Sequence, residues 1–154
     1  MKFQLKFTTD YRQFYVNDKN ANGNTSSDNF WTDQAFEDKL AVEDGVLGIG
    51  IANSEGLVDC TFEILNSKSS NNDFSEFDHV VEASLKIHSG VLQVIDCPFS
   101  EIEMEIKIEP GDYRIRVYSC NLKSAYNENP KDFYKIEIWK EVFSNRVVLK
   151  RYID

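Results

Sequence analysis

The side chains best placed to do chemistry in this sequence are the carboxylates between Trp31 and Gly45. This segment, WTDQAFEDKLAVEDG, contains five acidic residues and a single basic one, Lys39. Fixed carboxylates at this density can recognise a basic protein surface, because complementary fields speed and orient association. An ordinary solvated helix face is the competing interpretation. The five carboxylates belong to Asp33, Glu37, Asp38, Glu43 and Asp44.

Nucleophilic catalysis has little support, because neither of the two histidines stands in a recognisable catalytic motif. A site that joins Cys97 or Cys120 to a histidine, such as Cys97 with His79, is the enzymatic alternative. It requires those side chains to converge in a cleft. His88 adjoins a turn and offers no better context. We therefore predict that the protein is not an enzyme.

Cofactor and metal motifs are absent from the sequence, which lacks phosphate-binding glycine patterns and metal-ligand spacings. We expect no cofactor. One alternative is a calcium site in the loop at residues 73–78, since sandwich loops rich in Asp and Asn can supply oxygen ligands to hard cations. A solvated acidic loop is the other interpretation. The candidate ligands are Asp73, Glu76 and Asp78.

The length of 154 residues and the hydrophobic content of 42% fit one domain over residues 1–154. A net charge of −9 opposes binding to nucleic acid or to an anionic membrane and favours a basic protein partner. There is neither a signal-like start nor a membrane-spanning apolar run. Cys60, Cys97 and Cys120 are typical of free thiols, so we expect a cytoplasmic protein.

Charge is unevenly distributed along the chain. Residues 1–106 contain seven Lys/Arg and 19 Asp/Glu, whereas residues 107–154 contain ten and seven. If folding preserves this difference, one surface is strongly acidic. If strands from both parts interleave in the sheets, the difference is dispersed.

Apolar residues recur with period two through most of the sequence, which is typical of strands buried on one face. The fold class that we predict is all-β, an antiparallel β-sandwich of about nine or ten strands with one short α-helix. Polar loops are expected at residues 17–29, 66–78 and 121–132. The expected strands include 3–7, 12–16, 46–52, 58–64, 81–87, 133–139 and 147–152.

Two hairpins are expected from turn signals between alternating runs. The first turns at Pro110-Gly111 and places Glu105 opposite Arg116, a favourable cross-strand pair. The second turns at Ser89-Gly90 and pairs the strands on either side of it.

The acidic segment predicts the helix, with Thr32 as its N-cap and Gly45 as its stop. Phe36 and Leu40, four residues apart, should dock it on the sandwich. The glycines at 48 and 50 leave one strand face without side chains, so another element can approach that backbone closely, and this helix is one candidate. Glu37, Asp38 and Glu43 are expected to point to solvent.

Large aromatic residues are alternative anchors for a partner, because they dominate interface energetics. Trp31 precedes the helix and is expected to pack against Phe36 or Leu40, or else to be exposed. Tyr118 and Trp139 alternate with the inward-facing residues of their strands and should therefore point outward. They are anchors if they are exposed.

Several blocks of the sequence resemble the competence protein J family. Tyr11-Arg12-Gln13-Phe14 is similar to the first strand of that family, and Gly111-Asp112-Tyr113 to a late hairpin. The chain departs from the family in longer Asn/Ser-rich loops and in a strand-like tail after Trp139. The most specific block resembles the family's helix and following turn, and it consists of Trp31-Thr32-Asp33, Ala35, Ala41 and Asp44-Gly45.

The resemblance implies a non-catalytic inhibitor of a DNA-entry type nuclease or a related toxin, which binds its partner tightly. An acidic surface can compete with DNA for the basic cleft of such an enzyme. The alternative function is a β-sandwich module that binds carbohydrate or a calcium-dependent ligand. The residues predicted to contact the partner are Trp31, Asp33, Glu37, Asp38 and Asp44.

Overall fold

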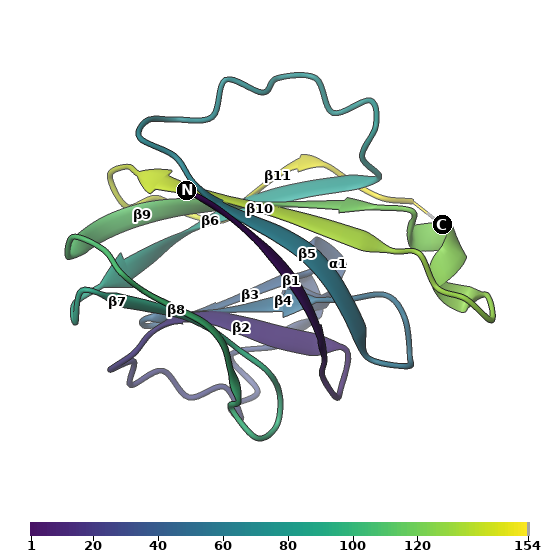
Figure 1. Ribbon diagram of the computed structural model, residues 1–154, viewed down its shortest axis with the longest axis horizontal. Helices are drawn as coiled ribbons and strands as arrows, with labels where there is room; N and C mark the ends of the chain where they lie inside the picture. Colours follow the sequence, from purple (N-terminus) through teal and green to yellow (C-terminus); the bar gives the residue numbers. More distant parts are fainter. Residues whose placement is uncertain (154) are drawn as a thin grey trace.

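The computed structural model describes residues 1–153 and shows two β-sheets packed face to face (Figure 1). Sheet A has six strands in the order β1-β5-β10-β9-β6-β11, and sheet B has five in the order β3-β4-β2-β7-β8. The predicted all-β sandwich with one short α-helix is therefore confirmed, with eleven strands where nine or ten were expected.

The strands of sheet A are β1 (Lys2–Thr8), β5 (Leu57–Ile64), β6 (His79–Ile87), β9 (Gly111–Cys120), β10 (Phe133–Lys140) and β11 (Val147–Lys150). Those of sheet B are β2 (Gln13–Asp18), β3 (Leu40–Glu43), β4 (Val46–Gly50), β7 (Val91–Ile95) and β8 (Ile102–Lys107). The helical elements are α1 (Asp33–Asp38) and the 3-10 helix η1 (Leu122–Tyr126). Neighbouring strands run antiparallel except β5 and β10, which are parallel.

The core lies between the two sheets and is formed by the apolar side of each alternating strand. Phe14 of β2, Ile49 of β4, Ile115 of β9 and Ile136 of β10 are completely buried there. This is the arrangement that period-two sequences produce when two sheets cover each other. No helix among residues 1–153 has the length and apolar character needed to cross a membrane.

Both predicted hairpins are wrong, because each turn carries the chain from one sheet to the other. β6 belongs to sheet A and β7 to sheet B, and β8 pairs with β7 whereas β9 pairs with β6 and β10. Ile108 N–H donates to the Gly90 carbonyl at 2.9 Å, so the two turns lie side by side. A strand with one apolar face satisfies either arrangement, and alternation alone cannot distinguish them.

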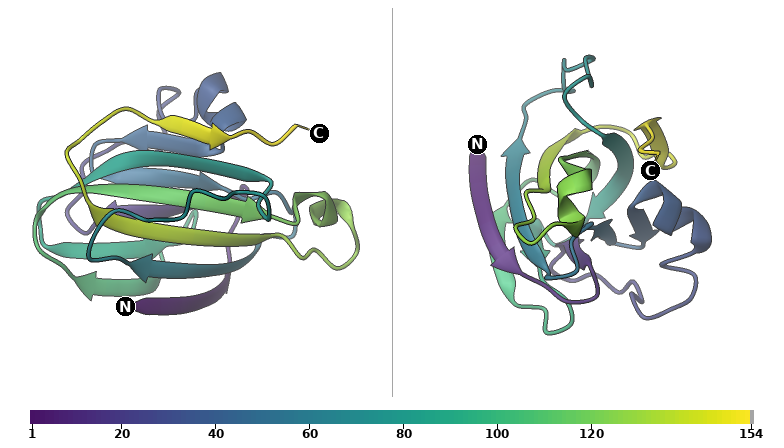
Figure 2. Two further views of the ribbon diagram at one scale, coloured as in Figure 1. Left: turned by 90° about the horizontal axis from the view of Figure 1, so that it is seen from above. Right: turned by 90° about the vertical axis from the view of Figure 1, so that its right-hand side faces the viewer.

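The outer face of sheet A is covered by two segments: residues 65–78 cross over β10 and β9, and residues 141–146 run from β10 across β9 and β6 to β11 (Figure 2). Phe74 and Phe77 pack on Tyr118, with ring centroids 6.0 and 4.8 Å from it. Tyr118 is 0% and Trp139 1% exposed, so neither can serve as an exposed anchor. Both side chains point to the outer face of the sheet, as predicted, but the covering segments bury them.

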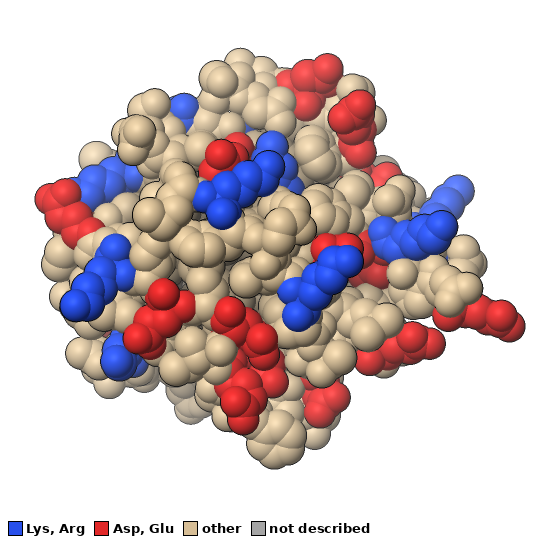
Figure 3. Space-filling model, in the orientation of Figure 1, with Lys and Arg blue, Asp and Glu red and all other residues tan. Residues whose placement is uncertain are grey.

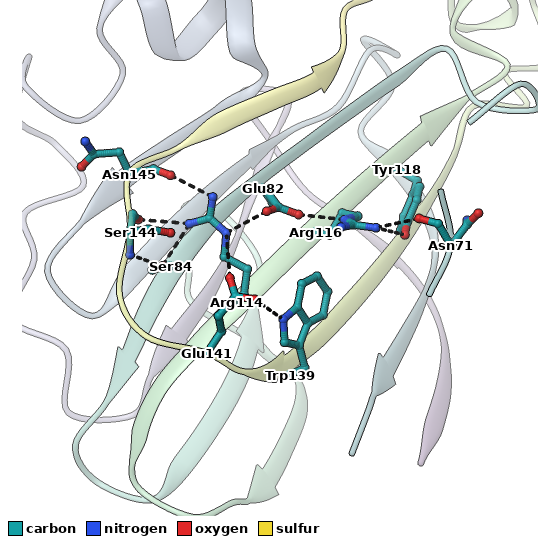
Figure 4. Close-up of polar contacts among 10 residues, drawn as sticks. All are labelled: Asn71, Glu82, Ser84, Arg114, Arg116, Tyr118, Trp139, Glu141, Ser144 and Asn145. Atoms are coloured by element: carbon teal, nitrogen blue, oxygen red, sulfur yellow. Dashed lines mark hydrogen bonds and ion pairs between the residues drawn. The ribbon is translucent and has the colours of Figure 1, made fainter. Parts of the chain in front are cut away.

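A buried polar network fills the space under this cover (Figure 4). Glu82 accepts hydrogen bonds from Arg114 Nε at 3.1 Å and Arg116 Nε at 2.8 Å. Glu82 therefore pairs with Arg116 in place of the predicted Glu105, which instead accepts from the Gln93 amide in sheet B. The guanidinium groups also donate to backbone carbonyls of the covering segments, namely those of Asn71, Ser144 and Asn145.

The charge difference between the two parts of the sequence is partly dispersed by the fold. Sheet A combines β1, β5 and β6 with β9, β10 and β11, whereas every strand of sheet B lies within residues 13–107. Acidic and basic side chains are both present across the face in Figure 3, with a group of acidic ones at its lower centre. Apart from Lys107 at the end of β8, the basic part of the chain thus lies in sheet A and its connections.

Candidate partner-binding surface

The acidic segment begins as predicted but changes structure halfway. Thr32 Oγ1 accepts the Ala35 N–H at 3.1 Å and caps α1, while Asp33 occupies its first turn. Lys39 then adopts a left-handed conformation with φ of 61° and ends the helix. The next residues form β3, which pairs with β4, so the helix predicted to reach Gly45 is about half as long as expected.

Phe36 and Leu40 do not dock together as expected. Leu40 is 0% exposed, but it enters the core from β3, whereas Phe36 is 62% exposed on α1. Trp31 stacks on Phe36 with ring centroids 5.1 Å apart, and its Nε1 donates to Gln13 Oε1 at 2.8 Å. The expected packing of Trp31 against Phe36 is therefore confirmed, and it fixes an apolar side chain that faces solvent.

The glycine-rich face of β4 is approached closely, as expected, although by the residues before the helix. A Cβ added at Gly48 would lie 2.8 Å from Phe30 Cζ and 3.0 Å from Trp31 Cζ2. At Gly50 the nearest atom, Trp31 Cη2, would be 3.6 Å away, which is an ordinary contact. Gly48 thus sets how deeply Phe30 and Trp31 sit against the sheet.

Asp38 is buried, which contradicts the expectation that it points to solvent. Its carboxylate accepts from Arg146 Nε at 2.8 Å, Arg151 Nη2 at 2.6 Å and Gln34 Nε2 at 2.9 Å. Burial alone raises the pKa of Asp38, but the hydrogen bonds from Arg151 and Gln34 and the charge of Arg146 outweigh it and lower that pKa. Figure 2 shows the result, with the C-terminal segment lying beside α1.

His79 completes the junction between α1 and the C-terminal segment. The Tyr152 N–H donates to His79 Nδ1 at 3.0 Å, so the proton of the neutral ring lies on Nε2, which donates to the Asp38 carbonyl at 2.8 Å. Burial lowers the pKa of His79, and the charges of Lys39 and Arg151 act in the same direction. Both ring nitrogens of His79 are therefore engaged.

The cysteine–histidine alternative finds no support within residues 1–153. Cys97 Sγ accepts the Tyr15 hydroxyl at 3.4 Å, and burial raises the pKa of the Cys97 thiol. Cys120 Sγ contacts the Phe133 carbonyl at 3.6 Å. Neither thiol is among the hydrogen-bond partners of His79.

Two of the three candidate calcium ligands already accept hydrogen bonds from the protein backbone. The Asp73 carboxylate accepts the Ser75 N–H at 3.0 Å, and that of Asp78 accepts the Leu122 N–H at 2.9 Å. Over residues 1–153, no three His, Cys, Asp or Glu side chains are arranged to hold a metal ion.

Three of the five predicted contact residues share one surface. Trp31, Asp33 and Glu37 lie at or on α1, with Asp33 and Glu37 exposed. Asp44 is exposed at the other end of β3, roughly 13 Å of strand away at 3.3 Å per residue. Sequence reasoning missed Arg146 and Arg151, whose only signal was the basic character of residues 107–154.

Comparison with known proteins supports the fold. No protein-family model matches the chain, and no curated protein matches it significantly. The chain is similar to the crystal structure of ComJ, inhibitor of the DNA degrading activity of NucA, from Bacillus subtilis, with a TM-score of 0.66 and 18% identity over 92% of this chain and 96% of ComJ. A structure described as Crocagin biosynthetic gene J gives a TM-score of 0.48 and 15% identity over 92% and 99%. The chain therefore has a ComJ-like fold.

Proposed function

We propose that this protein is a non-catalytic inhibitor of a nuclease and acts by binding that enzyme. The observation that carries the proposal is the similarity to ComJ, an inhibitor of the DNA degrading activity of NucA, over nearly the whole length of both chains. The identity of 18% leaves the choice of nuclease open to a different member of the class or to a related toxin.

The surface around α1 supplies suitable chemistry for this function. Phe36, 62% exposed and stacked on Trp31, offers the rigid apolar contact that dominates many interfaces. Asp33 and Glu37 lie on the same helix and carry exposed carboxylates. A nuclease holds polyanionic DNA in a basic cleft, and these carboxylates occupy positions that phosphates would take there.

The remaining predicted residues have different places in this proposal. Asp38 positions α1 through Arg146 and Arg151 and does not itself meet the partner. Asp44 is reached by a partner that extends along β3.

The direct test is an inhibition assay with a nuclease of the NucA kind. The full chain is mixed with the enzyme at increasing ratios, and the degradation of linear DNA is followed on gels. We expect degradation to stop near an equimolar ratio, with a stable complex on gel filtration. Unchanged degradation together with no complex would refute the proposal.

A further inference from the structure

A cavity of about 240 Å³ opens beside α1, at the end of the sandwich where the turn between β1 and β2 meets the end of β4. Tyr11 and Arg12 line it from the turn, Trp31 and Phe36 from the helix side, and Lys39 from the start of β3. Tyr11 and Phe36 are 74% and 62% exposed, so the cavity continues outward into an aromatic rim.

The backbone around this cavity is held in an unusual conformation. Tyr11, Arg12 and Lys39 have φ values of 59°, 56° and 61°, and they are three of the five non-glycine residues with positive φ in residues 1–153. Such conformations are costly for residues with a Cβ and concentrate at functional sites. The Arg12 carbonyl accepts the Ile51 N–H at 2.9 Å and the Lys39 carbonyl accepts the Gly50 N–H at 3.2 Å, so the last residue of β4 and the residue after it hold both strained segments.

Two polar groups in the cavity walls, the Trp31 indole N–H and the Tyr134 hydroxyl, are already hydrogen-bonded within the protein. Trp31 Nε1 donates to Gln13 Oε1 at 2.8 Å. The Tyr134 hydroxyl accepts the Ala52 N–H at 2.8 Å and donates to Asp132 Oδ2 at 2.7 Å. The walls therefore offer mainly aromatic and aliphatic surface to an occupant. The shape of the cavity is set before binding.

The charges at the cavity differ in sign from the protein as a whole. Arg12 and Lys39 line it, and neither forms an ion pair within residues 1–153. Lys39 Nζ instead lies 5.8 Å from the centre of the Tyr152 ring. In a chain with a net charge of −9, two cations without carboxylate partners form a local site for an anionic group.

We propose that this cavity binds one aromatic side chain of the partner protein, together with a carboxylate next to it in the partner's sequence. The aromatic ring packs between Tyr11 and the stacked pair of Trp31 and Phe36, and the carboxylate pairs with Arg12 or Lys39. The inference rests on the proposed function in taking that partner to be a nuclease. It adds a specific anchor to the charge complementarity supplied by Asp33 and Glu37.

The first test compares exposed aromatic residues inside and outside the cavity. Tyr11→Ala and Phe36→Ala remove its rim, whereas Phe99→Ala and Tyr126→Ala remove side chains that are 78% and 72% exposed elsewhere. We expect the rim variants to weaken the complex with the nuclease about tenfold, and the controls about twofold or less. Similar losses in both pairs, or none in the rim variants, would overturn the inference while leaving inhibition by the wild-type protein intact.

The second test does not need the nuclease. Capped tetrapeptides Gly-Phe-Asp-Gly, Gly-Phe-Lys-Gly and Gly-Ala-Asp-Gly are titrated into the full chain, and the fluorescence of Trp31 is followed with acrylamide as quencher. Trp139 is 1% exposed, so quenching reports on Trp31. We expect the Phe-Asp peptide to bind about tenfold more tightly than the other two.

The charge requirement is tested on the protein side with Arg12→Glu. The matched control is Lys107→Glu, an exposed residue on β8 with the same change in charge. Arg12→Glu should abolish the preference for Asp over Lys in the peptide, and Lys107→Glu should preserve it. Equal binding of all three peptides to the wild-type protein would overturn the anchor site, whereas selective binding without inhibition of the nuclease would refute only the proposed function.

Discussion

At the scale of single residues, Glu82 holds two buried guanidinium groups in place. Glu82, Arg114 and Arg116 are at most 9% exposed, and the Glu82 carboxylate bonds both arginines, while Glu141 lies 4.0 Å from Arg114 as a second counter-charge. Burial alone lowers the pKa of Arg116, but the hydrogen bonds to Glu82 and Tyr118 outweigh it and raise that pKa. Because the arginines also hold the covering segments, Glu82 indirectly holds the cover of sheet A in place (Figure 4).

Replacing Glu82 by glutamine should lower the free energy of unfolding by about 3 kcal/mol, since buried Arg116 then loses its carboxylate partner and Arg114 keeps only the more distant Glu141. Urea denaturation measures the change. The exposed Glu128 provides the control, because Glu128→Gln removes a carboxylate without a buried partner and should change the free energy by no more than about 0.5 kcal/mol. If Glu82→Gln lowers the free energy of unfolding no more than Glu128→Gln does, the arginines do not depend on the Glu82 carboxylate.

The candidate contact residues show how far sequence can resolve single side chains. Glu37 and Asp38 are adjacent acidic residues at the end of one helix, and nothing local distinguishes them. The structure exposes Glu37 and buries Asp38, because Arg146 and Arg151 arrive from positions 108 and 113 residues later in the chain. A single sequence contains no signal for such a distant pairing.

At the scale of elements, the bare face of β4 was predictable because the absence of side chains is itself a sequence feature. What approaches that face was not predictable, since the occupant is the Phe30–Trp31 segment and not the helix body. The length of the helix was also misjudged. Leu40, Ala41 and Val42 fit a helical face as well as a strand, and the left-handed Lys39 that separates the two is not a glycine.

Two glycines on this face provide a matched pair of substitutions. Gly48→Ala places a Cβ within 3.0 Å of Phe30 and Trp31 and should lower the free energy of unfolding by about 1–3 kcal/mol. Gly50→Ala meets only ordinary contacts and should change it by less than about 1 kcal/mol. Thermal and urea denaturation of both variants check this order, and equal losses would contradict the packing of Phe30 and Trp31 on Gly48.

The junction of α1 with the C-terminal segment gives the protein a defined response to pH. The pKa of His79 is lower in the folded state than its ordinary value of about 6.5, so the unfolded chain takes up the proton first as pH falls. The stability contributed by neutral His79 is therefore complete above about pH 6.5 and is lost below it, by at most about 1.4 kcal/mol per pH unit. Protonation of Nδ1 also removes the acceptor for the Tyr152 N–H.

We expect the free energy of unfolding of His79→Gln to fall less steeply between about pH 6.5 and 5 than that of the wild type. The control is His88→Gln, because His88 is exposed on the turn after β6. Amide exchange at residues 147–152 should accelerate on acidification in the wild type. Identical pH slopes for wild type and His79→Gln would contradict this linkage.

At the scale of the whole molecule, the sandwich architecture followed from the sequence but the connections between its strands did not. Alternation specifies that each strand has one buried face, and enough such strands require two sheets. It does not specify which sheet each strand joins, so the turns at 89–90 and 110–111 were misassigned as hairpins. The arrangement also determines charge, because sheet B receives strands only from the more acidic part of the chain.

The net charge of −9 should accelerate association with a basic nuclease, and the acidic residues of α1 should contribute disproportionately. We expect the double variant Asp33→Lys/Glu37→Lys to associate about tenfold more slowly and to depend less on salt. The variant Glu76→Lys/Glu128→Lys changes the net charge equally at exposed positions away from α1. Stopped-flow measurements at two salt concentrations compare them, and equal rates would exclude α1 from the interface.

The turns at 89–90 and 110–111, which are two of the connections that cross between the sheets, also determine how the chain must assemble. A hairpin lets neighbouring strands pair as soon as their turn closes, but here β6 and β7, and likewise β8 and β9, belong to different sheets. Much of the pairing in sheet A, including that of β5 with β10, must await segments far away in the sequence. Such non-local topologies fold slowly and leave strands exposed to neighbouring chains. The alternating glutamates at 101, 103 and 105 place charges on and beside the open edge strand β8, and charged edges disfavour pairing with another chain.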